Sequence, residues 1–304
     1  MSKVFSGIGK LPGGDADNSV TEGCIVLEGG AFRGIYTSGV LDALMEENIN
    51  MRCTVGVSAG ALNGINYVAG QIGRSARINL RYRHDNRYVG VKAFSQNRGI
   101  IGFDFIFGPD NMKHVPKLNM KRFMNPDRQF YAVVTNLYSG KTEYISKNSG
   151  IDIFQAVRAS ASMPYISMPI MLGGYPYLDG GCSCKIPYPW ALEQNFGKII
   201  VVKTRSKSYR KKTEPHKNIN VDNIMYHSYP NFVKSLNRSN EYYNFLCDDL
   251  ERLSDDGRVF VISPSEQIEI NRLEGDMEKL GKFYYLGYND TKKCVKKLKD
   301  YLNN

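Results

Sequence analysis

Short apolar runs alternate with helical patterns over the first 70 residues of the chain. Residues 24–28 form a compact apolar run that predicts a buried strand, and apolar residues then recur every three or four positions from Tyr36 to Met45, as in an amphipathic helix. A second run at residues 53–55 predicts the next strand, and the small apolar stretch 59–69 predicts a helix packed on a sheet. Strands that alternate with helices indicate a mainly parallel sheet with right-handed crossovers.

The same two patterns continue to the C-terminus. Further strands are predicted at residues 129–137, 141–145, 168–172, 176–178, 198–204 and 258–263, and helices at 153–162, 231–253 and 276–302. Residues 74–128 follow neither pattern regularly and carry an apolar, aromatic stretch between Gly99 and Gly108. This insert could be a lid, a wall of an acyl-binding groove or a loop packed over the core. We therefore predict one α/β domain.

Composition narrows the class of protein. The 304 residues are 42% hydrophobic and 23% charged, which is ordinary globular usage and argues against disorder. The formal net charge of +10 favours contact with polyanions, either nucleic acid or an anionic membrane surface. No stretch has the length and apolar character of a membrane span or signal peptide. These features predict a cytoplasmic protein that meets membranes only at their periphery.

The six cysteines are too few and too scattered for a disulfide scaffold, so we expect reduced thiols. Cys182 and Cys184 form a CxC pair, but no second cysteine or histidine pair stands at zinc-finger spacing. We expect no metal site and no cofactor.

A GxSxG pattern at residues 56–60 supplies the first candidate for chemistry. It follows a predicted strand and precedes a predicted helix, which is the setting of a turn that exposes the central hydroxyl, here that of Ser58. Gly56 and Gly60 allow strand and helix to approach closely. Unpaired amides at the start of the helix favour negative charge beside Ser58.

A glycine-rich loop at residues 29–34 follows the first strand. Its glycines do not have the spacing of a dinucleotide fingerprint, and no P-loop lysine follows. The loop offers backbone amides that can hold an oxyanion. Arg33 adds a cation there, either to stabilise negative charge or to pair with Glu28.

The third candidate is Asp179, which precedes Gly180 and Gly181 at the end of a short strand. The sequence Asp-Gly-Gly is also an ordinary turn signal. A carboxylate there is of interest because Ser58 needs a base.

Together these motifs resemble those of the patatin-like phospholipases, in order and in spacing. The resemblance rests on residues 29–34, 56–60 and 179–181, with further likeness at 133–140, 159–164 and 186–187. It implies a doubly wound α/β sheet in three layers and a Ser-Asp dyad, without a catalytic histidine, that hydrolyses acyl esters of lipids. The implied nucleophile is Ser58 and the implied base is Asp179.

The same resemblance implies an oxyanion hole and a division of the chain. The oxyanion donors would be the amides of Gly29, Gly30 and Ala31 and the side chain of Arg33, with Gly34 completing the loop. Ala31 replaces the family's usual third glycine, so the loop is unstrained only if this residue has a negative φ. We expect the chain to divide into a flexible N-terminus (1–22), a catalytic core (23–204) with a possible lid at about 74–128, and a C-terminal extension of the same domain (205–304) with a basic loop.

Two other interpretations stay open at this point. A conventional Ser-Asp-His triad would use His216 or His227. A non-catalytic polyanion binder would use the basic runs 205–212 and 292–299, although no nucleic-acid-binding motif accompanies them and we expect no nucleic acid partner. The expected partner is a lipid or another acyl ester; its acyl chain and headgroup, and the oligomeric state, are not predicted.

Overall fold

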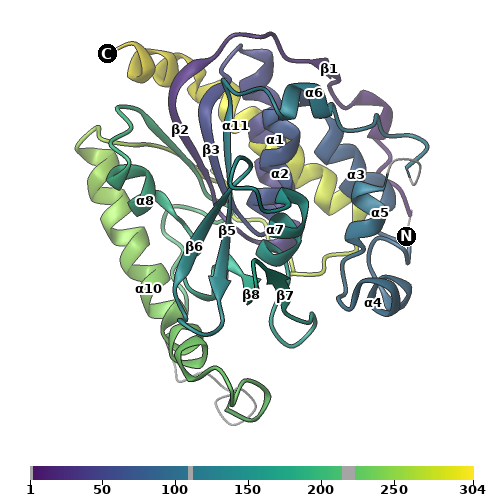
Figure 1. Cartoon of the computed structure of the whole chain (residues 1–304). Helices are drawn as coiled ribbons and strands as arrows, with labels where there is room; N and C mark the ends of the chain where they lie inside the picture. The colour runs from purple at the N-terminus through teal and green to yellow at the C-terminus, as the bar shows by residue number, and fades with distance from the viewer. Residues whose placement is uncertain (1–2, 109–111, 214–222) are drawn as a thin grey trace.

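The computed structural model describes residues 3–108, 112–213 and 223–304. A mostly parallel sheet lies between two layers of helices (Figure 1). The parallel strands, in sheet order, are β10 (Phe260–Ile262), β9 (Ile199–Val202), β2 (Thr21–Leu27), β3 (Met51–Val57) and β5 (Gln129–Asn136). The predicted three-layer α/β architecture is confirmed.

Antiparallel strands complete the sheet beyond β5. They are β6 (Thr142–Ser146), β8 (Tyr175–Asp179) and β7 (Ile170–Leu172). The turn at 139–140 is too short for a crossover, so the chain returns antiparallel from β5 to β6. In the register of β5, Val57 of β3 lies opposite Val133 and Asp179 of β8 lies opposite Val134. The ends of β3 and β8 therefore meet at consecutive residues of one strand.

Alternation within the strands builds the two helical layers. Ile25 and Leu27 of β2 face one core, and Cys24 and Val26 face the other. On the first side lie α1 (Gly34–Glu46), α2 (Ala59–Val68), α3 (Arg74–Tyr82), α7 (Ile153–Ser160) and α11 (Met277–Asn303). On the second side lie α8 (Tyr188–Glu193) and α10 (Pro230–Asp255). Because strand residues are buried on both faces, they read as continuous apolar runs.

The residues expected to form a flexible N-terminus pack on the domain. Phe5, Leu11 and Ala16 are buried in the first core, and the two-residue strand β1 (Gly14–Asp15) pairs with β4 (Gln71–Ile72). A few apolar side chains among glycines and polar residues give no periodic signal, so the sequence did not reveal this packing.

The described residues of the insert at 74–128 (74–108 and 112–128) contain α3 and the shorter helices α4 (Val91–Asn97), α5 (Phe103–Phe107) and α6 (Met120–Phe123). Ile78 and Leu80 of α3 and Phe105 of α5 are buried. Much of the insert is thus part of the core, and whether any of it moves as a lid stays a prediction.

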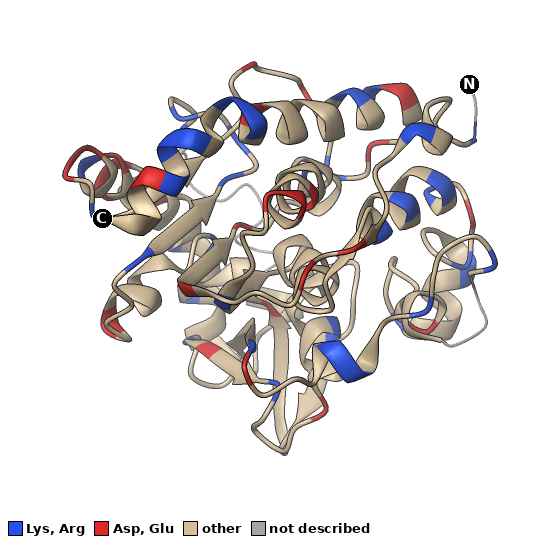
Figure 2. Cartoon of the chain, turned by 90° about the horizontal axis from the view of Figure 1, so that it is seen from above, with Lys and Arg blue, Asp and Glu red and all other residues tan. Residues whose placement is uncertain are grey.

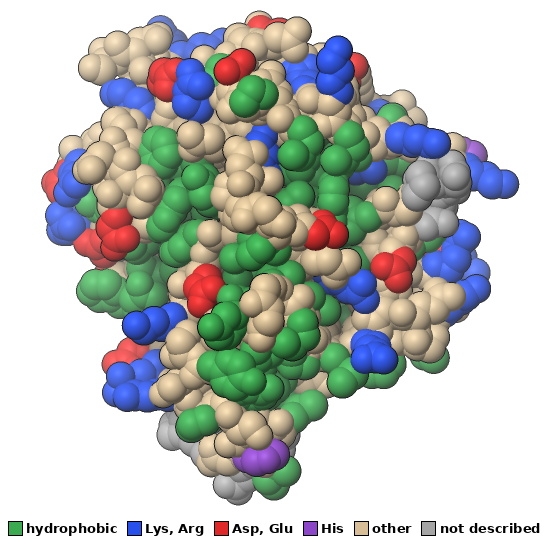
Figure 3. Space-filling model, in the orientation of Figure 1, with side chains coloured by type: hydrophobic (Ala, Val, Ile, Leu, Met, Phe, Trp, Pro, Cys, Tyr) green, Lys and Arg blue, Asp and Glu red, His purple; other side chains and the backbone are tan. Residues whose placement is uncertain are grey.

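Apolar side chains also reach the surface beside β7 and β8. Tyr138, Met171 and Tyr175 are exposed there, and hydrophobic side chains gather over the antiparallel strands (Figure 3). Among the described residues, none of the helices has the length and apolar character that a membrane span requires.

Candidate active site

Ser58 occupies a strained turn between β3 and α2. Its φ is 56° and its ψ is −120°, a left-handed conformation that side chains rarely adopt. The Ser58 amide donates to Oγ of Ser160 at 2.9 Å, and that hydroxyl donates to the carbonyl of Val133 at 2.6 Å. Ser160 is fully buried, so it holds the strained turn against β5.

The glycines of the GxSxG pattern are required by close packing. A Cβ on Gly60 would lie 2.3 Å from the carbonyl oxygen of Leu27, and one on Gly56 would lie 2.6 Å from the amide nitrogen of Ala61. Both clashes are with backbone, which cannot move aside without separating α2 from the sheet. The two glycines of the pattern are therefore required by packing.

Asp179 lies at the end of β8, directly beside Ser58. Its carboxylate accepts a hydrogen bond from the Ser58 side chain and one from the Gly181 amide at 2.7 Å. Burial raises the pKa of Asp179 to about 6, and the hydrogen bonds from Ser58 and Gly181 oppose this rise. Close packing also fixes the turn, since a Cβ on Gly180 would lie 2.3 Å from the Val133 carbonyl oxygen.

The glycine loop runs past Ser58 from the end of β2. A Cβ on Gly29 would lie 3.2 Å from Cβ of Ser58, so the loop backbone touches the serine. The Gly29 amide donates to the Lys185 carbonyl at 3.4 Å, whereas the amides of Gly30 and Ala31 have no partner among the described residues. Gly30 and Ala31 are the better placed of the three to donate to a ligand.

Ala31 has a φ of +49°, so the unstrained alternative is wrong for this residue. A Cβ in the left-handed region approaches the following carbonyl, at a cost of roughly 1–2 kcal/mol. The structure thus retains strain where a glycine would have none.

We expect Ala31→Gly to increase the free energy of unfolding by about 0.5–1 kcal/mol, because relief of the strain exceeds the entropy that glycine adds to the unfolded chain. Urea unfolding would measure the change. Ala59→Gly is a matched control: Ala59 is not among the positive-φ residues and begins α2, so its replacement should destabilise. Equal destabilisation by both substitutions would contradict this account.

Arg33 does not pair with Glu28. The Glu28 carboxylate accepts hydrogen bonds from the amide and the hydroxyl of Thr204 instead. Nε of Arg33 is buried and has no hydrogen-bond partner in the described part of the chain. Desolvation, together with the charge of nearby Arg205, lowers the pKa of Arg33 to about 10. The guanidinium is left available to a ligand.

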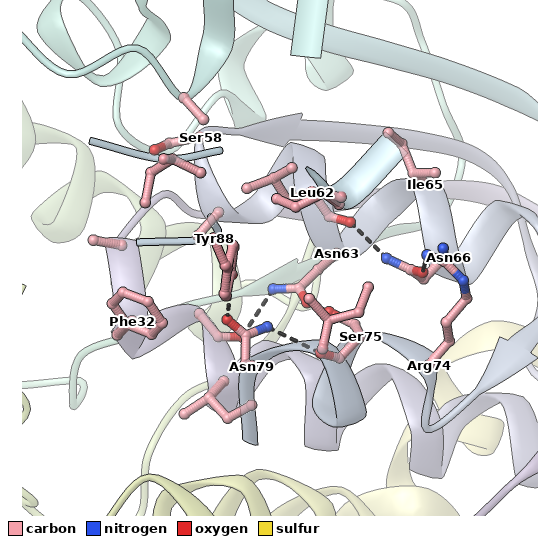
Figure 4. A pocket seen from close by; sticks show the side chains of 18 of the residues that line it. Phe32, Ser58, Leu62, Asn63, Ile65, Asn66, Arg74, Ser75, Asn79 and Tyr88 are labelled. Atoms are coloured by element: carbon pink, nitrogen blue, oxygen red, sulfur yellow. Dashed lines mark hydrogen bonds between the residues drawn. The ribbon is translucent and has the colours of Figure 1, made fainter. Parts of the chain in front are cut away.

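Ser58 lies where two cavities meet. The first, of about 60 Å³, has an apolar lining that includes Phe32, Leu62 and Ile65, and Figure 4 shows Ser58 at its edge. The polar side chains that line it are already hydrogen-bonded: Asn66 to Arg74, for example, and Tyr88 to Asn79. The cavity therefore offers mainly apolar surface to a ligand. The insert contributes to its wall through Ile78, Tyr88, Ile101, Ile106 and Phe107.

The second cavity, of about 350 Å³, contains Ser58 and Asp179 together with the glycine loop. Its basic lining residues are Arg33, Lys185, Arg205, Lys211 and Arg272. The sequence patterns did not identify Lys185 or Arg272, because neither residue belongs to a motif. Ser160 lies within the segment 159–164, but no role was assigned to it from the sequence.

His227, one of the two histidines considered for a triad, is not part of this site. His227 is exposed, its ring contacts Ile224 and Ser228, and it does not line either cavity. His216 lies outside the described residues. Nothing in the described part of the chain places a histidine beside Ser58 and Asp179.

The basic run 292–299 lies against acidic residues of the chain itself. Lys292 forms ion pairs with Glu46 and Glu47, and Lys299 pairs with Glu47. Lys and Arg occur on several elements, interspersed with Asp and Glu (Figure 2). This run is therefore partly neutralised within the fold.

Comparison with known proteins decides the family. Residues 25–192 match the model of the patatin-like phospholipases, which covers more than half of the chain. The chain belongs to the patatin-like phospholipase family. Residues 229–303, which span α10 to α11, match the model of a domain of unknown function, DUF6363.

Two individual proteins resemble this chain, one in sequence and one in fold. The chain is 28% identical over 185 residues to the uncharacterized protein YjjU of Escherichia coli (strain K12), an alignment that covers 59% of this chain and 51% of that protein. It thus spans about half the length of that relative. The crystal structure of VipD from Legionella pneumophila has a similar fold, with a TM-score of 0.50 and 14% identity over 98% of this chain and 71% of the other. A patatin-like fold and family point to lipid acyl hydrolysis in general.

Proposed function

We propose that this patatin-like chain is a serine lipid acyl hydrolase that uses Ser58 as nucleophile and Asp179 as base. The observation that carries the proposal is the hydrogen bond from the Ser58 side chain to the buried Asp179 carboxylate, at the junction of an apolar and a polar cavity. A hydroxyl is a weak nucleophile until a neighbouring group accepts its proton, and this arrangement supplies that group.

The proposed reaction has two steps that share the same groups. Oγ of Ser58 attacks the ester carbonyl while Asp179 accepts its proton; the tetrahedral adduct then collapses, the C–O bond to the alcohol breaks and the proton passes to the leaving alkoxide. Water next attacks the acyl-serine, gives a proton to Asp179 and releases the fatty acid, and that proton returns to Ser58.

The raised pKa of Asp179 suits this role. An ordinary carboxylate, with a pKa near 3.9, is too weak a base to accept a hydroxyl proton readily. With a pKa of about 6, Asp179 is a stronger base and is still mostly deprotonated at neutral pH.

We assign the oxyanion to the loop beside Ser58. The amides of Gly30 and Ala31, which have no partner among the residues that the structure describes, would donate to the developing negative charge. Arg33 would add a positive charge and the Gly29 amide a weaker contribution. The first backbone amides of α2 also lie next to Ser58, and the positive end of the helix dipole there would likewise stabilise negative charge.

A fluorophosphonate probe tests this proposal, because it reacts with an activated serine. We expect peptide mapping to find the modification on Ser58. The labelling rate should rise about tenfold per pH unit below pH 6 and level off above pH 7, because only the carboxylate form of Asp179 accepts the proton. Modification of another residue, or a rate that does not vary between pH 5 and 7, would be evidence against the proposal.

A further inference from the structure

The polar cavity beside Ser58 is strongly cationic. Five basic side chains line it, and they come from separate parts of the chain: the glycine loop, the segment after Gly181, the basic loop at 205–212 and the segment before α11. Among the described residues, only two carboxylates, those of Glu28 and Asp179, line the same cavity. Both are engaged, Glu28 by Thr204 and Asp179 by Ser58 and Gly181. Within the described part of the chain, the acids that line the cavity do not balance its positive charge.

In the basic loop at 205–212, some basic side chains are paired with acids and others line the cavity. Arg210 forms ion pairs with Asp248 and Glu251 of α10, and Lys207 pairs with Asp255. Arg205 and Lys211 line the cavity and form no ion pair among the described residues. Basic residues from one short loop thus divide into two sets, and one set is left for a ligand.

The positions of these two side chains are supported by their surroundings. The guanidinium of Arg205 lies 4.4 Å from the ring centre of Tyr209, and Nζ of Lys211 lies 5.1 Å from that of Tyr243. The backbone of Lys211 is anchored to α10, since its amide donates to Asn244 and its carbonyl accepts from the same side chain. The site is therefore largely pre-formed.

Mutual repulsion acts within the set. Burial, followed by the charges of Lys185 and Arg272, lowers the pKa of Lys211 to about 7. Burial likewise lowers the pKa of Lys185 to about 8. A bound anion would favour the charged form of each lysine.

The two cavities share part of their lining, namely Ala31, Ser58, Met163 and Leu273. In a glycerophospholipid the cleaved ester joins an apolar acyl chain to a glycerol that carries the phosphate. When the ester carbonyl lies at Ser58 and the acyl chain occupies the apolar cavity, the phosphate lies in the cationic cavity. Headgroups that end in a quaternary or primary ammonium would bring a positive charge close to the cationic side chains of Arg205 and Lys211, which would repel it. A phosphate without such a group would not be repelled.

We propose that Arg33, Lys185, Arg205, Lys211 and Arg272 form a headgroup site that selects acyl lipids bearing a phosphate with no compensating cation. The inference rests on the proposed hydrolase function and names its substrate class. Arg205, Lys211 and Arg272 determine the specificity, since they belong to none of the motifs around Ser58.

The test compares phosphatidic acid with phosphatidylcholine of the same acyl chains, in mixed micelles of one neutral detergent. We expect the wild-type chain to have the higher kcat/KM for phosphatidic acid. Lys211→Met and Arg272→Gln should each reduce the ratio of the two kcat/KM values about tenfold or more, because each removes a charge-assisted contact to the phosphate. Arg210→Gln is the matched control: its side chain pairs with α10, outside the cavity, and its loss should leave the ratio unchanged.

Each outcome bears on the inference. An unchanged ratio in Lys211→Met and Arg272→Gln, or an equal fall in Arg210→Gln, would overturn it. Inhibition by inorganic phosphate without any preference for phosphatidic acid would mean that the site takes free phosphate, and would overturn it as well. Turnover of a phosphate-free chromogenic ester, measured in parallel, tests the hydrolase itself: if this ester is cleaved while the ratio does not respond, only the headgroup site fails.

Discussion

Ser58→Ala is expected to reduce kcat/KM for a chromogenic acyl ester by at least about 10³-fold, because the covalent step loses its nucleophile. The substitution removes only Oγ. The amide of residue 58 still donates to Ser160, and the positive φ is as accessible to alanine as to serine. Binding and the oxyanion donors would remain, so residual activity should reflect those groups alone.

Initial rates over a range of ester concentrations would measure this loss, with fluorophosphonate labelling as a second readout. Ser149→Ala is a suitable control, since Ser149 is exposed and its hydroxyl bonds only to nearby backbone, donating to the carbonyl of Ser146 and accepting from the amide of Ile151. That variant should keep wild-type kinetics. Activity of Ser58→Ala within a few-fold of wild type would remove Ser58 from the mechanism.

Asp179→Asn is expected to reduce kcat/KM by about 10²–10⁴-fold, the usual contribution of a general base. Asparagine has nearly the same shape and can still accept from the Gly181 amide, but at neutral pH it cannot take the proton of Ser58. The remaining activity should lose the pH dependence near 6 that the carboxylate confers. A variant that keeps a profile with this pKa would show that another group is the base.

The same substitution should not weaken the fold. Burial raises the pKa of Asp179 to about 6, so the carboxyl favours folding most at low pH and loses that contribution as the pH rises from about 4 to 6. Above pH 6 the buried charge then costs roughly 2–3 kcal/mol relative to an unperturbed carboxyl. We expect Asp179→Asn to be at least as stable as wild type at pH 7, by urea unfolding, with a smaller difference at pH 4.

The strands and helices around the site follow from local pattern. The strands β2, β3, β5 and β9 are buried on both faces, and their apolar runs are visible in the sequence for that reason. The antiparallel part was predicted as strands, but its position in the sheet depends on which edge of β5 each strand occupies. The packing of Phe5 and Leu11 depends on distant residues and leaves no periodic trace.

The two groups proposed for catalysis could be picked out in the sequence because glycines surround them. Close approach of backbone segments permits no Cβ at Gly56, Gly60 or Gly180, and these requirements mark the turns that hold Ser58 and Asp179. The hydrogen bond between Ser58 and Asp179 depends on the register of β3 and β8 along β5. The sequence likewise left open whether the φ of Ala31 is negative or positive, and the structure shows that it is positive.

The sequence by itself determined the α/β class, the turns that carry the hydroxyl and the carboxylate, and the excess of basic residues. Only the tertiary structure decided where those charges act. Arg205 and Lys211 are indistinguishable in sequence from Lys207 and Arg210, yet one pair lines the cavity at Ser58 and the other is paired with acids of α10. The physical reason is the distance along the sequence over which each interaction acts. Hydrogen bonding and steric fit within a turn involve neighbouring residues, whereas the ion-pair partner of a charged side chain depends on how its loop docks against a helix distant in sequence.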